Sequence, residues 1–339
     1  MEYRNLGRTG VKVSPLCLGA MNFGMAAEEK ESIEIIDAAL DAGINFIDTA
    51  NVYSRGVSEE IVGKALRQNG KRDRIVLATK VWARMDDDDP NAQWGTRRHI
   101  IEQCEASLKR LQTEYIDLYQ IHRPSSEYPI DETLRALDDL IRDGKVRYIG
   151  TSTFAAWQIV ESLWVSREYG LNRFVCEQPP YNLLDRRIER EMLPMAQTYG
   201  IGIIPWSPLA SGRFSGKYSR GEDAPEGTRL HNAVQDSERT IDDFMPPPVW
   251  DVIEGIDALA AEKETALASL ALAWVVQQPG VTSPIIGPRT MAHLEGNLQA
   301  LGVEFTEEEL KRIDEIIPPG TFVRNYYQGA DWSPSKYRW

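Results

Sequence analysis

Hydrophobic residues along the chain form two alternating patterns. Short, nearly continuous apolar runs are typical of buried strands, and they end near eight positions: Gly19, Asp48, Lys80, His122, Ser152, Gln178, Trp206 and Gly287. Between them lie segments with apolar residues spaced i, i+3, i+4 and i+7, such as 29–42 and 131–143, each followed by a helix-ending glycine. This α/β alternation predicts a parallel sheet covered by helices. Eight units favour a (β/α)8 TIM barrel over a doubly wound sheet.

Three segments depart from this repeat. Residues 1–15 contain "YRNLGRTGVKVS", which predicts a β-hairpin lying across the bottom of the barrel. Residues 207–250 are rich in glycine, proline and charge, including "MPPPVW", and predict a long loop on the top face. A last helix over 306–317 begins with the capping box "TEEE", and a tail over 318–339 follows it.

The tail carries six aromatic residues, Phe322, Tyr326, Tyr327, Trp332, Tyr337 and Trp339. They have two interpretations. The tail is either a strap that packs on the barrel wall, or an apolar wall of a substrate pocket beside Phe23 and Trp82.

Composition and charge narrow the classes of function. The 339 residues are 42% hydrophobic, enough for one large core, and we expect a single domain over residues 1–339. A net charge of -13 opposes binding to nucleic acid or to an anionic membrane, because both call for a basic face. No run approaches the roughly 20 apolar residues of a membrane span, and the first residues lack the apolar segment of a secretory signal. We therefore expect a cytoplasmic protein with a small-molecule partner, and a homo-oligomer stays open.

The cysteines and the acidic run do not indicate a metal site. Cys17, Cys104 and Cys176 have no CxxC spacing and fall in apolar patterns, which predicts buried thiols. The run "MDDDDP" over 85–90 is typical of a solvated loop.

Candidate chemistry lies at the ends of the first strands. In a barrel the C-terminal strand ends share one mouth, so Asp48, Lys80 and His122 should converge there, with Tyr53 on the loop above Asp48. A free tyrosine has a pKa of about 10, and an adjacent ammonium favours its phenolate. Lys80 can supply that ammonium, Asp48 can hold it by a charge-assisted hydrogen bond, and His122 can orient a carbonyl oxygen. A tyrosine acid facing a carbonyl calls for a hydride from a cofactor.

These motifs resemble the aldo-keto reductase superfamily. The resemblance covers nearly the whole chain, in "GINFIDTANVYS", "LATK", "DLYQIH", "GTST", "EQPPYN", "PWSPLASG" and "IIGPRT". It implies a catalytic tetrad of Asp48, Tyr53, Lys80 and His122. The sequences of these motifs are similar to those of the bacterial branches close to the potassium-channel β subunits.

The resemblance also implies NADPH as the cofactor. Ser152 and Gln178 would hydrogen-bond the nicotinamide carboxamide, and Trp206 would stack on the ring. Asp48 would belong to the cofactor site as well as to the catalytic tetrad. The remaining contacts are expected from Ser207, Leu209, Ser211, Lys217, Gly287, Arg289, His293 and Asn297. Two positions depart from the family pattern: Thr153 stands where many relatives have Asn or Arg, and Gly296 where many have a Glu that contacts the adenine.

We therefore expect an NADPH-dependent reductase of aldehydes or ketones, with Tyr53 as general acid. The alternative is a cofactor-loaded regulatory subunit of the channel type, although no docking segment is evident. Other signals are weaker. "GRFSGKY" lacks the spacing and the hydroxyl of a Walker loop. Asp48 and Glu177 could be the two carboxylates of a glycosidase, but Lys80 and Tyr53 beside Asp48 fit that chemistry less well.

Overall fold

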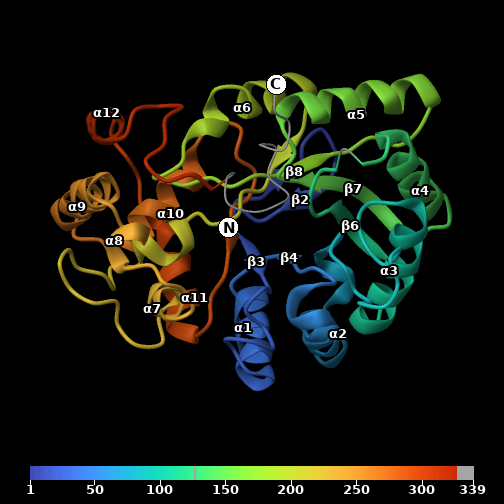
Figure 1. Ribbon diagram of the computed structural model, residues 1–339, viewed down its shortest axis with the longest axis horizontal. Coiled ribbons are helices and arrows are strands. Elements are labelled where there is room, and N and C mark those ends of the chain that lie inside the picture. Colours follow the sequence, from blue (N-terminus) through green and yellow to red (C-terminus); the bar gives the residue numbers. More distant parts are fainter. Residues whose placement is uncertain (126, 327–339) are drawn as a thin grey trace.

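The protein is a (β/α)8 barrel in the computed structural model, which describes residues 1–125 and 127–326 (Figure 1). Eight parallel strands follow the order β10-β3-β4-β5-β6-β7-β8-β9. They are β3 (Cys17–Gly19), β4 (Phe46–Asp48), β5 (Val76–Val81), β6 (Ile116–Ile121), β7 (Val146–Ser152), β8 (Cys176–Gln178), β9 (Gly202–Ile203) and β10 (Ile285–Ile286). The predicted fold class is confirmed, and the doubly wound alternative is excluded.

Backbone hydrogen bonds join the two outermost strands and close the sheet. The amide of Thr282 donates to the carbonyl of Ile203 at 2.7 Å, and that of Ile285 donates to the carbonyl of Pro205 at 2.8 Å. A bridge between Ile203 and Val281 continues the contact. Closure brings all eight strand ends to one mouth.

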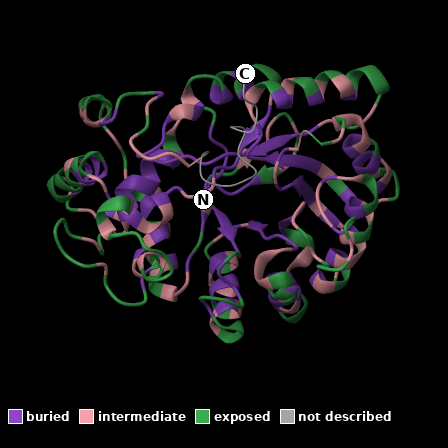
Figure 2. Cartoon of the chain, in the orientation of Figure 1, coloured by how far each residue is buried: buried purple, intermediate pink, exposed green. Residues whose placement is uncertain are grey.

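Helices cover the outside of the sheet (Figure 1). The helices of the described residues are α1 (Glu29–Asp41), α2 (Val57–Asn69), α3 (Arg97–Leu111), α4 (Ile130–Arg142), α5 (Ala156–Tyr169), α6 (Met192–Tyr199), α7 (Arg229–Gln235), α8 (Ile241–Phe244), α9 (Pro247–Glu262), α10 (Leu267–Gln277), α11 (Met291–Gln299) and α12 (Glu307–Ile316). Most of them have a buried inner face and an exposed outer face, whereas α10 is buried on nearly all sides (Figure 2). The predicted capping box on α12 is confirmed, with Thr306 as the N-cap and Glu309 reaching back to it.

Five short 3-10 turns complete the part of the chain that the structure describes. They are η1 (Tyr53–Gly56), η2 (Arg72–Arg74), η3 (Arg187–Glu189), η4 (Ala210–Ser215) and η5 (Ala300–Gly302). None of the described helices is long and apolar enough to cross a membrane.

The N-terminal hairpin closes the bottom of the barrel, as predicted. Its strands β1 (Arg4–Asn5) and β2 (Lys12–Val13) pair antiparallel, and Leu6 and Val13 are fully buried against the barrel interior. Gly7 has a φ of +56°, and a Cβ atom there would lie 2.5 Å from the carbonyl oxygen of Val175. The close approach of the hairpin to the strands therefore depends on glycine.

The segment 207–250 differs from the predicted loop. It contains η4, α7 and α8, and the prolines of "MPPPVW" begin α9 instead of continuing the loop. Pro246 is the N-cap of α9, and Pro247 and Pro248 occupy its first two positions. Proline suits this position because its fixed φ is helical and its missing N–H has no partner in a first turn.

Alternation along the strands sorts the barrel interior into two layers. Phe46, Ala78, Leu118 and Cys176 form an apolar layer above the hairpin, together with other buried residues. Two residues further along the same strands, the side chains that share that face are Asp48, Lys80, Gln120 and Gln178. A buried polar layer thus lies directly on an apolar one. The three cysteines are free and buried, which confirms that prediction.

Candidate active site

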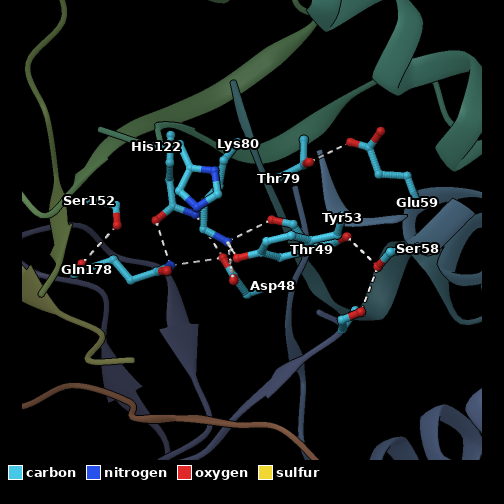
Figure 3. Close-up of polar contacts among 12 residues, drawn as sticks. Asp48, Thr49, Tyr53, Ser58, Glu59, Thr79, Lys80, His122, Ser152 and Gln178 are labelled. Atoms are coloured by element: carbon cyan, nitrogen blue, oxygen red, sulfur yellow. Dashed lines mark hydrogen bonds and ion pairs between the residues drawn. The ribbon is translucent and has the colours of Figure 1, made fainter. Parts of the chain in front are cut away.

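Lys80 connects two of the predicted residues inside the barrel mouth (Figure 3). Its Nζ donates to Asp48 Oδ2 at 2.5 Å, to the Thr49 carbonyl at 2.8 Å and to the Tyr53 hydroxyl at 3.2 Å. Lys80 is fully buried and Asp48 is 2% exposed. An ammonium without solvent is stable only with such partners, so this ion pair belongs to the interior of the fold.

The charge of Lys80 is fixed by its neighbours. Burial opposes the charged form, but the carboxylate of Asp48 and the hydroxyl of Tyr53 outweigh it and raise the pKa of Lys80 above its ordinary value. Lys80 is therefore an ammonium throughout the neutral range.

Tyr53 reaches this ammonium through a tight turn after β4. Its amide donates to the Ala50 carbonyl at 3.1 Å, and the next two residues, Ser54 and Arg55, have φ values of +49° and +52°. Non-glycine residues adopt this left-handed conformation at an energetic cost, which the surrounding structure has to offset. The half-buried ring of Tyr53 lies edge to face with His122, with 5.7 Å between ring centroids.

His122 follows β6 and is held by its backbone, with its amide donating to the Val81 carbonyl at 3.0 Å. Burial, followed by the charges of Arg123 and Lys80, lowers the pKa of His122 well below its ordinary value. The imidazole is therefore neutral, with one N–H donor and one acceptor nitrogen. The structure thus brings together all four residues that sequence analysis expected.

Gln120 was missed by sequence analysis. Its Nε2 donates to Asp48 Oδ1 at 2.9 Å, and Gln178 Nε2 donates to the same oxygen at 3.0 Å. The signal was available in "DLYQIH", because Gln120 shares the inward strand face with Leu118 and His122. A polar side chain at an interior position of a buried strand needs a polar partner.

The residues expected at the nicotinamide lie beside this group. Ser152 pairs with Gln178 across β7 and β8, and its hydroxyl donates to the Gln178 carbonyl at 3.0 Å. Trp206 is partly exposed, and its indole Nε1 is buried without a hydrogen-bond partner among the described residues. Tyr326 packs edge-on against the Trp206 ring with 6.1 Å between centroids.

The loop after β9 is conformationally strained where the pyrophosphate was expected. Ser207, Ala210 and Ser211 have φ values of +54°, +51° and +56°. Leu209 is partly buried against the core. Such clustered outliers are typical of ligand-binding loops.

Cationic side chains gather where the adenosine end was expected. Lys217 Nζ lies 3.1 Å from His293 Nε2, and the Arg289 amide nitrogen lies 3.4 Å from His293 Nδ1. Burial and the charge of Arg289 lower the pKa of both Lys217 and Arg229. Within residues 1–125 and 127–326, none of these three cations forms an ion pair with a carboxylate.

Three further residues complete this region. Asn297 is buried on α11, and the carbonyl of Gly287 accepts a hydrogen bond from Asn22 Nδ2 at 2.9 Å. A Cβ atom at Gly296 would meet no neighbour, so the position where the family resemblance led us to expect a glutamate has room for a side chain.

The expected substrate-pocket residues are in different environments. Trp82 is partly buried, and its Nε1 has no hydrogen-bond partner among the described residues. Phe23, in contrast, has no exposed surface and packs in the main hydrophobic core. The expectation that Phe23 lines a pocket is therefore not met in this structure, because a side chain inside the core presents no surface to a ligand.

The described part of the tail is attached to the loop after β8. The amides of Val323 and Arg324 donate to the Leu184 carbonyl, and the amide of Tyr326 donates to Asp185 Oδ2 at 3.0 Å. These are the contacts of a strap, and they carry Tyr326 to Trp206. The other aromatic residues of the predicted wall, from Tyr327 onward, lie outside the described residues.

The glycosidase alternative fails on strand geometry. Glu177 lies on the outer face of β8, where it accepts hydrogen bonds from Thr151 Oγ1 at 2.5 Å and from the Phe154 amide at 3.1 Å. Asp48 lies on the inner face of β4. The two carboxylates are on opposite faces of the sheet and cannot flank one substrate bond.

Comparison with known proteins agrees with this geometry. Residues 15–318 match the model of the Aldo/keto reductase family. The chain belongs to this family. It is 40% identical to the uncharacterized oxidoreductase YrpG of Bacillus subtilis, over 94% of this chain and 97% of that protein.

Two other relatives of this aldo/keto reductase differ in their assigned roles. The chain is 38% identical to a probable voltage-gated potassium channel subunit beta of Oryza sativa subsp. japonica, over 94% of this chain and 97% of the relative. It is 35% identical to versiconal hemiacetal acetate reductase of Aspergillus parasiticus, over 94% and 98% respectively. Family and relatives support an oxidoreductase, and the family generally uses a nicotinamide cofactor.

Proposed function

We propose that this aldo/keto reductase reduces aldehydes or ketones to alcohols with NADPH, reversibly, and that Tyr53 is the general acid. The observation that carries the proposal is the position of Lys80 Nζ, in contact with both Asp48 Oδ2 and the Tyr53 hydroxyl. An ammonium at 3.2 Å stabilises the negative charge that the phenol oxygen acquires when it gives up its proton. Asp48 holds the ammonium in place while this happens.

His122 would orient the substrate. Its neutral imidazole can donate one hydrogen bond to a carbonyl oxygen without competing with Tyr53 as a proton source. Tyr53 and His122 lie edge to face, so an oxygen between them would receive two hydrogen bonds. That arrangement favours charge building up on the oxygen in the transition state.

The donor set fits NADPH. Gln178 would hold the carboxamide, Trp206 would lie against the ring, and the cationic cluster of Lys217, Arg229 and Arg289 would hold phosphate. Cations without carboxylate partners are unusual in a chain of net charge -13, and a phosphate-bearing ligand would supply the missing negative charge. When bound, the cofactor supplies the hydride that carbonyl reduction requires.

The remaining features are part of the same proposal. We infer a single domain over residues 1–339, a cytoplasmic location and a small carbonyl substrate approached past Trp82. The net charge of -13 supports a small-molecule partner, because nucleic acid would call for a basic face.

A carbonyl panel tests the proposal. Purified protein is mixed with NADPH and aldehydes or ketones, and NADPH oxidation is compared with alcohol formed. The expected result is one alcohol per NADPH oxidised, with the reverse reaction on sugar and polyol alcohols with NADP. NADPH binding without turnover of any carbonyl would contradict it.

A second candidate function is supported by the 38% identity to the probable channel subunit beta of rice. In this version the barrel is a cofactor-loaded regulatory subunit with slow turnover. Stopped-flow measurement over several turnovers, with NADPH and carbonyl in excess, separates the two, because an enzyme releases its oxidised cofactor and turns over again, whereas a sensor retains it.

A further inference from the structure

Gln120 completes a closed hydrogen-bonded triangle with Asp48 and Gln178. Its Nε2 lies 2.9 Å from Asp48 Oδ1, and Gln178 Nε2 lies 3.0 Å from the same oxygen. Gln178 Nε2 also donates to Gln120 Oε1 at 3.2 Å. The expected cofactor contacts do not include Gln120, whose side chain reaches the cofactor side of the mouth through Gln178.

The polarity of this triangle is fixed by the carboxylate. An ionised carboxylate only accepts hydrogen bonds, so both amides must turn their nitrogens toward Asp48 Oδ1. Lys80 occupies the other oxygen, Oδ2, and leaves Asp48 no freedom to reorient. Gln120 Oε1 then receives the second hydrogen of the Gln178 amide.

This arrangement leaves the side-chain oxygen of Gln178, Oε1, for a ligand. Both hydrogens of its Nε2 are taken by Asp48 and Gln120, and its Oε1 receives no hydrogen bond from any described residue. Asp48 Oδ1 fixes which end of the Gln178 amide faces the carboxylate, and Gln120 Oε1 fixes the rotation of that amide, because it accepts the second hydrogen of Nε2. Gln178 therefore offers an acceptor, and only an acceptor, to a ligand.

We propose that Gln120 is a positioning residue. It holds the side-chain oxygen of Gln178, Oε1, toward the cofactor and so selects nicotinamides that carry an N–H donor. This rests on the proposed use of NADPH. The carboxamide of nicotinamide has the required NH2 group, whereas the 3-acetyl group of an acetylpyridine analogue has a carbonyl and a methyl. Asp48 thereby serves two sites at once, with Oδ2 on the acid side and Oδ1 on the cofactor side.

The test is binding, measured without turnover. NADPH and its reduced 3-acetylpyridine analogue are titrated against the protein, and fluorescence gives the dissociation constant of each. The wild type should prefer NADPH by about tenfold, the contribution of one hydrogen bond between neutral groups. In Gln120→Leu this preference should fall to about twofold or less, with affinity for the analogue unchanged.

Tyr119→Phe is the matched control. Tyr119 is the neighbouring residue of β6, points to the outer face and donates to the Ile100 carbonyl at 3.3 Å, so its loss also removes one buried hydrogen bond from the strand. It should keep the full preference for NADPH. If Gln120→Leu does not fold, Gln120→Met, which keeps the side-chain length, answers the same question.

Two outcomes would overturn the inference. The wild type could bind both compounds equally, or Gln120→Leu could keep the preference of Tyr119→Phe. Failure of the wild type to bind either compound would instead contradict the proposed NADPH function, and the inference with it.

Discussion

The Nζ atom of Lys80 lies 3.2 Å from the phenol oxygen of Tyr53, and both atoms face the inside of the barrel mouth. Two residues 27 positions apart meet because β5 ends beside β4 and the turn after β4 returns over it. The contact links a buried ion pair to the proposed acid. It follows that Lys80 contributes both to stability and to activity, and that suitable variants can separate the two contributions.

Lys80→Met should lower both properties. It removes the ammonium from Tyr53 and leaves Asp48 as an uncompensated buried carboxylate, which costs about 3 to 5 kcal/mol of unfolding free energy. Turnover should fall about 10²-fold or more. The double variant Asp48→Asn/Lys80→Met should recover much of the stability in urea unfolding but none of the activity. Recovery of both would mean that the lysine acts only through the fold.

Cofactor choice should depend on Arg289. A charged hydrogen bond contributes about 1.5 to 3 kcal/mol, so NADPH should bind at least about tenfold tighter than NADH, and Arg289→Met should remove most of that difference. Arg220→Met is the control, because Arg220 is also an arginine outside the helices and strands but is paired with Asp251 and Glu254. Fluorescence titration of both cofactors gives the ratio. An unchanged ratio in Arg289→Met would place the 2′-phosphate elsewhere.

Glu177 should make stability depend on pH. Burial raises its pKa to about 8, whereas an unfolded glutamate titrates near about 4.3. Between these values the folded protein keeps a proton that the unfolded chain releases, so this contribution is complete below about pH 4.3 and is lost as pH rises through about 8.

The variant Glu177→Gln isolates this effect. Its amide oxygen can still accept from Phe154, and it does not titrate. Urea unfolding at several pH values from 5 to 8 should show wild-type stability falling relative to the variant, by at most about 1.4 kcal/mol per pH unit. Parallel curves would indicate that Glu177 stays ionised in the folded protein.

Tyr326 should support the Trp206 ring. Tyr326→Leu removes the aromatic edge 6.1 Å from that ring and should weaken NADPH binding several-fold. Phe322→Leu is the control, because Phe322 lies on the same tail but is 47% exposed and contacts Arg187 of η3 instead of Trp206. Equal effects of the two variants on NADPH affinity would mean that the tail acts only as a strap.

Much of the fold was predictable because strand ends and helix faces are local patterns. The apolar runs before Asp48 and Lys80 identified their strands, and the barrel then required both to reach one mouth. Gln120 was missed because its partners, Asp48 and Gln178, lie on β4 and β8, which are not neighbours of β6 in the sheet. These side chains meet inside the barrel, and a single apolar run does not show that contact.

Other errors have the same origin. Phe23 was expected beside Trp82 in a pocket, but its ring is taken into the core. The prolines before Trp250 were interpreted as loop because proline breaks helices, whereas here they begin one. In both cases the packing of distant segments decides between two local possibilities.

The central claim is that Tyr53 donates the proton, and steady-state kinetics of Tyr53→Phe with NADPH and an aldehyde that the wild type reduces tests it most directly. Phenylalanine keeps the ring beside His122 and removes only the hydroxyl that Lys80 contacts. Turnover should fall about 10²-fold or more while NADPH affinity, measured in parallel, stays within about twofold. Turnover at the wild-type rate would contradict the account.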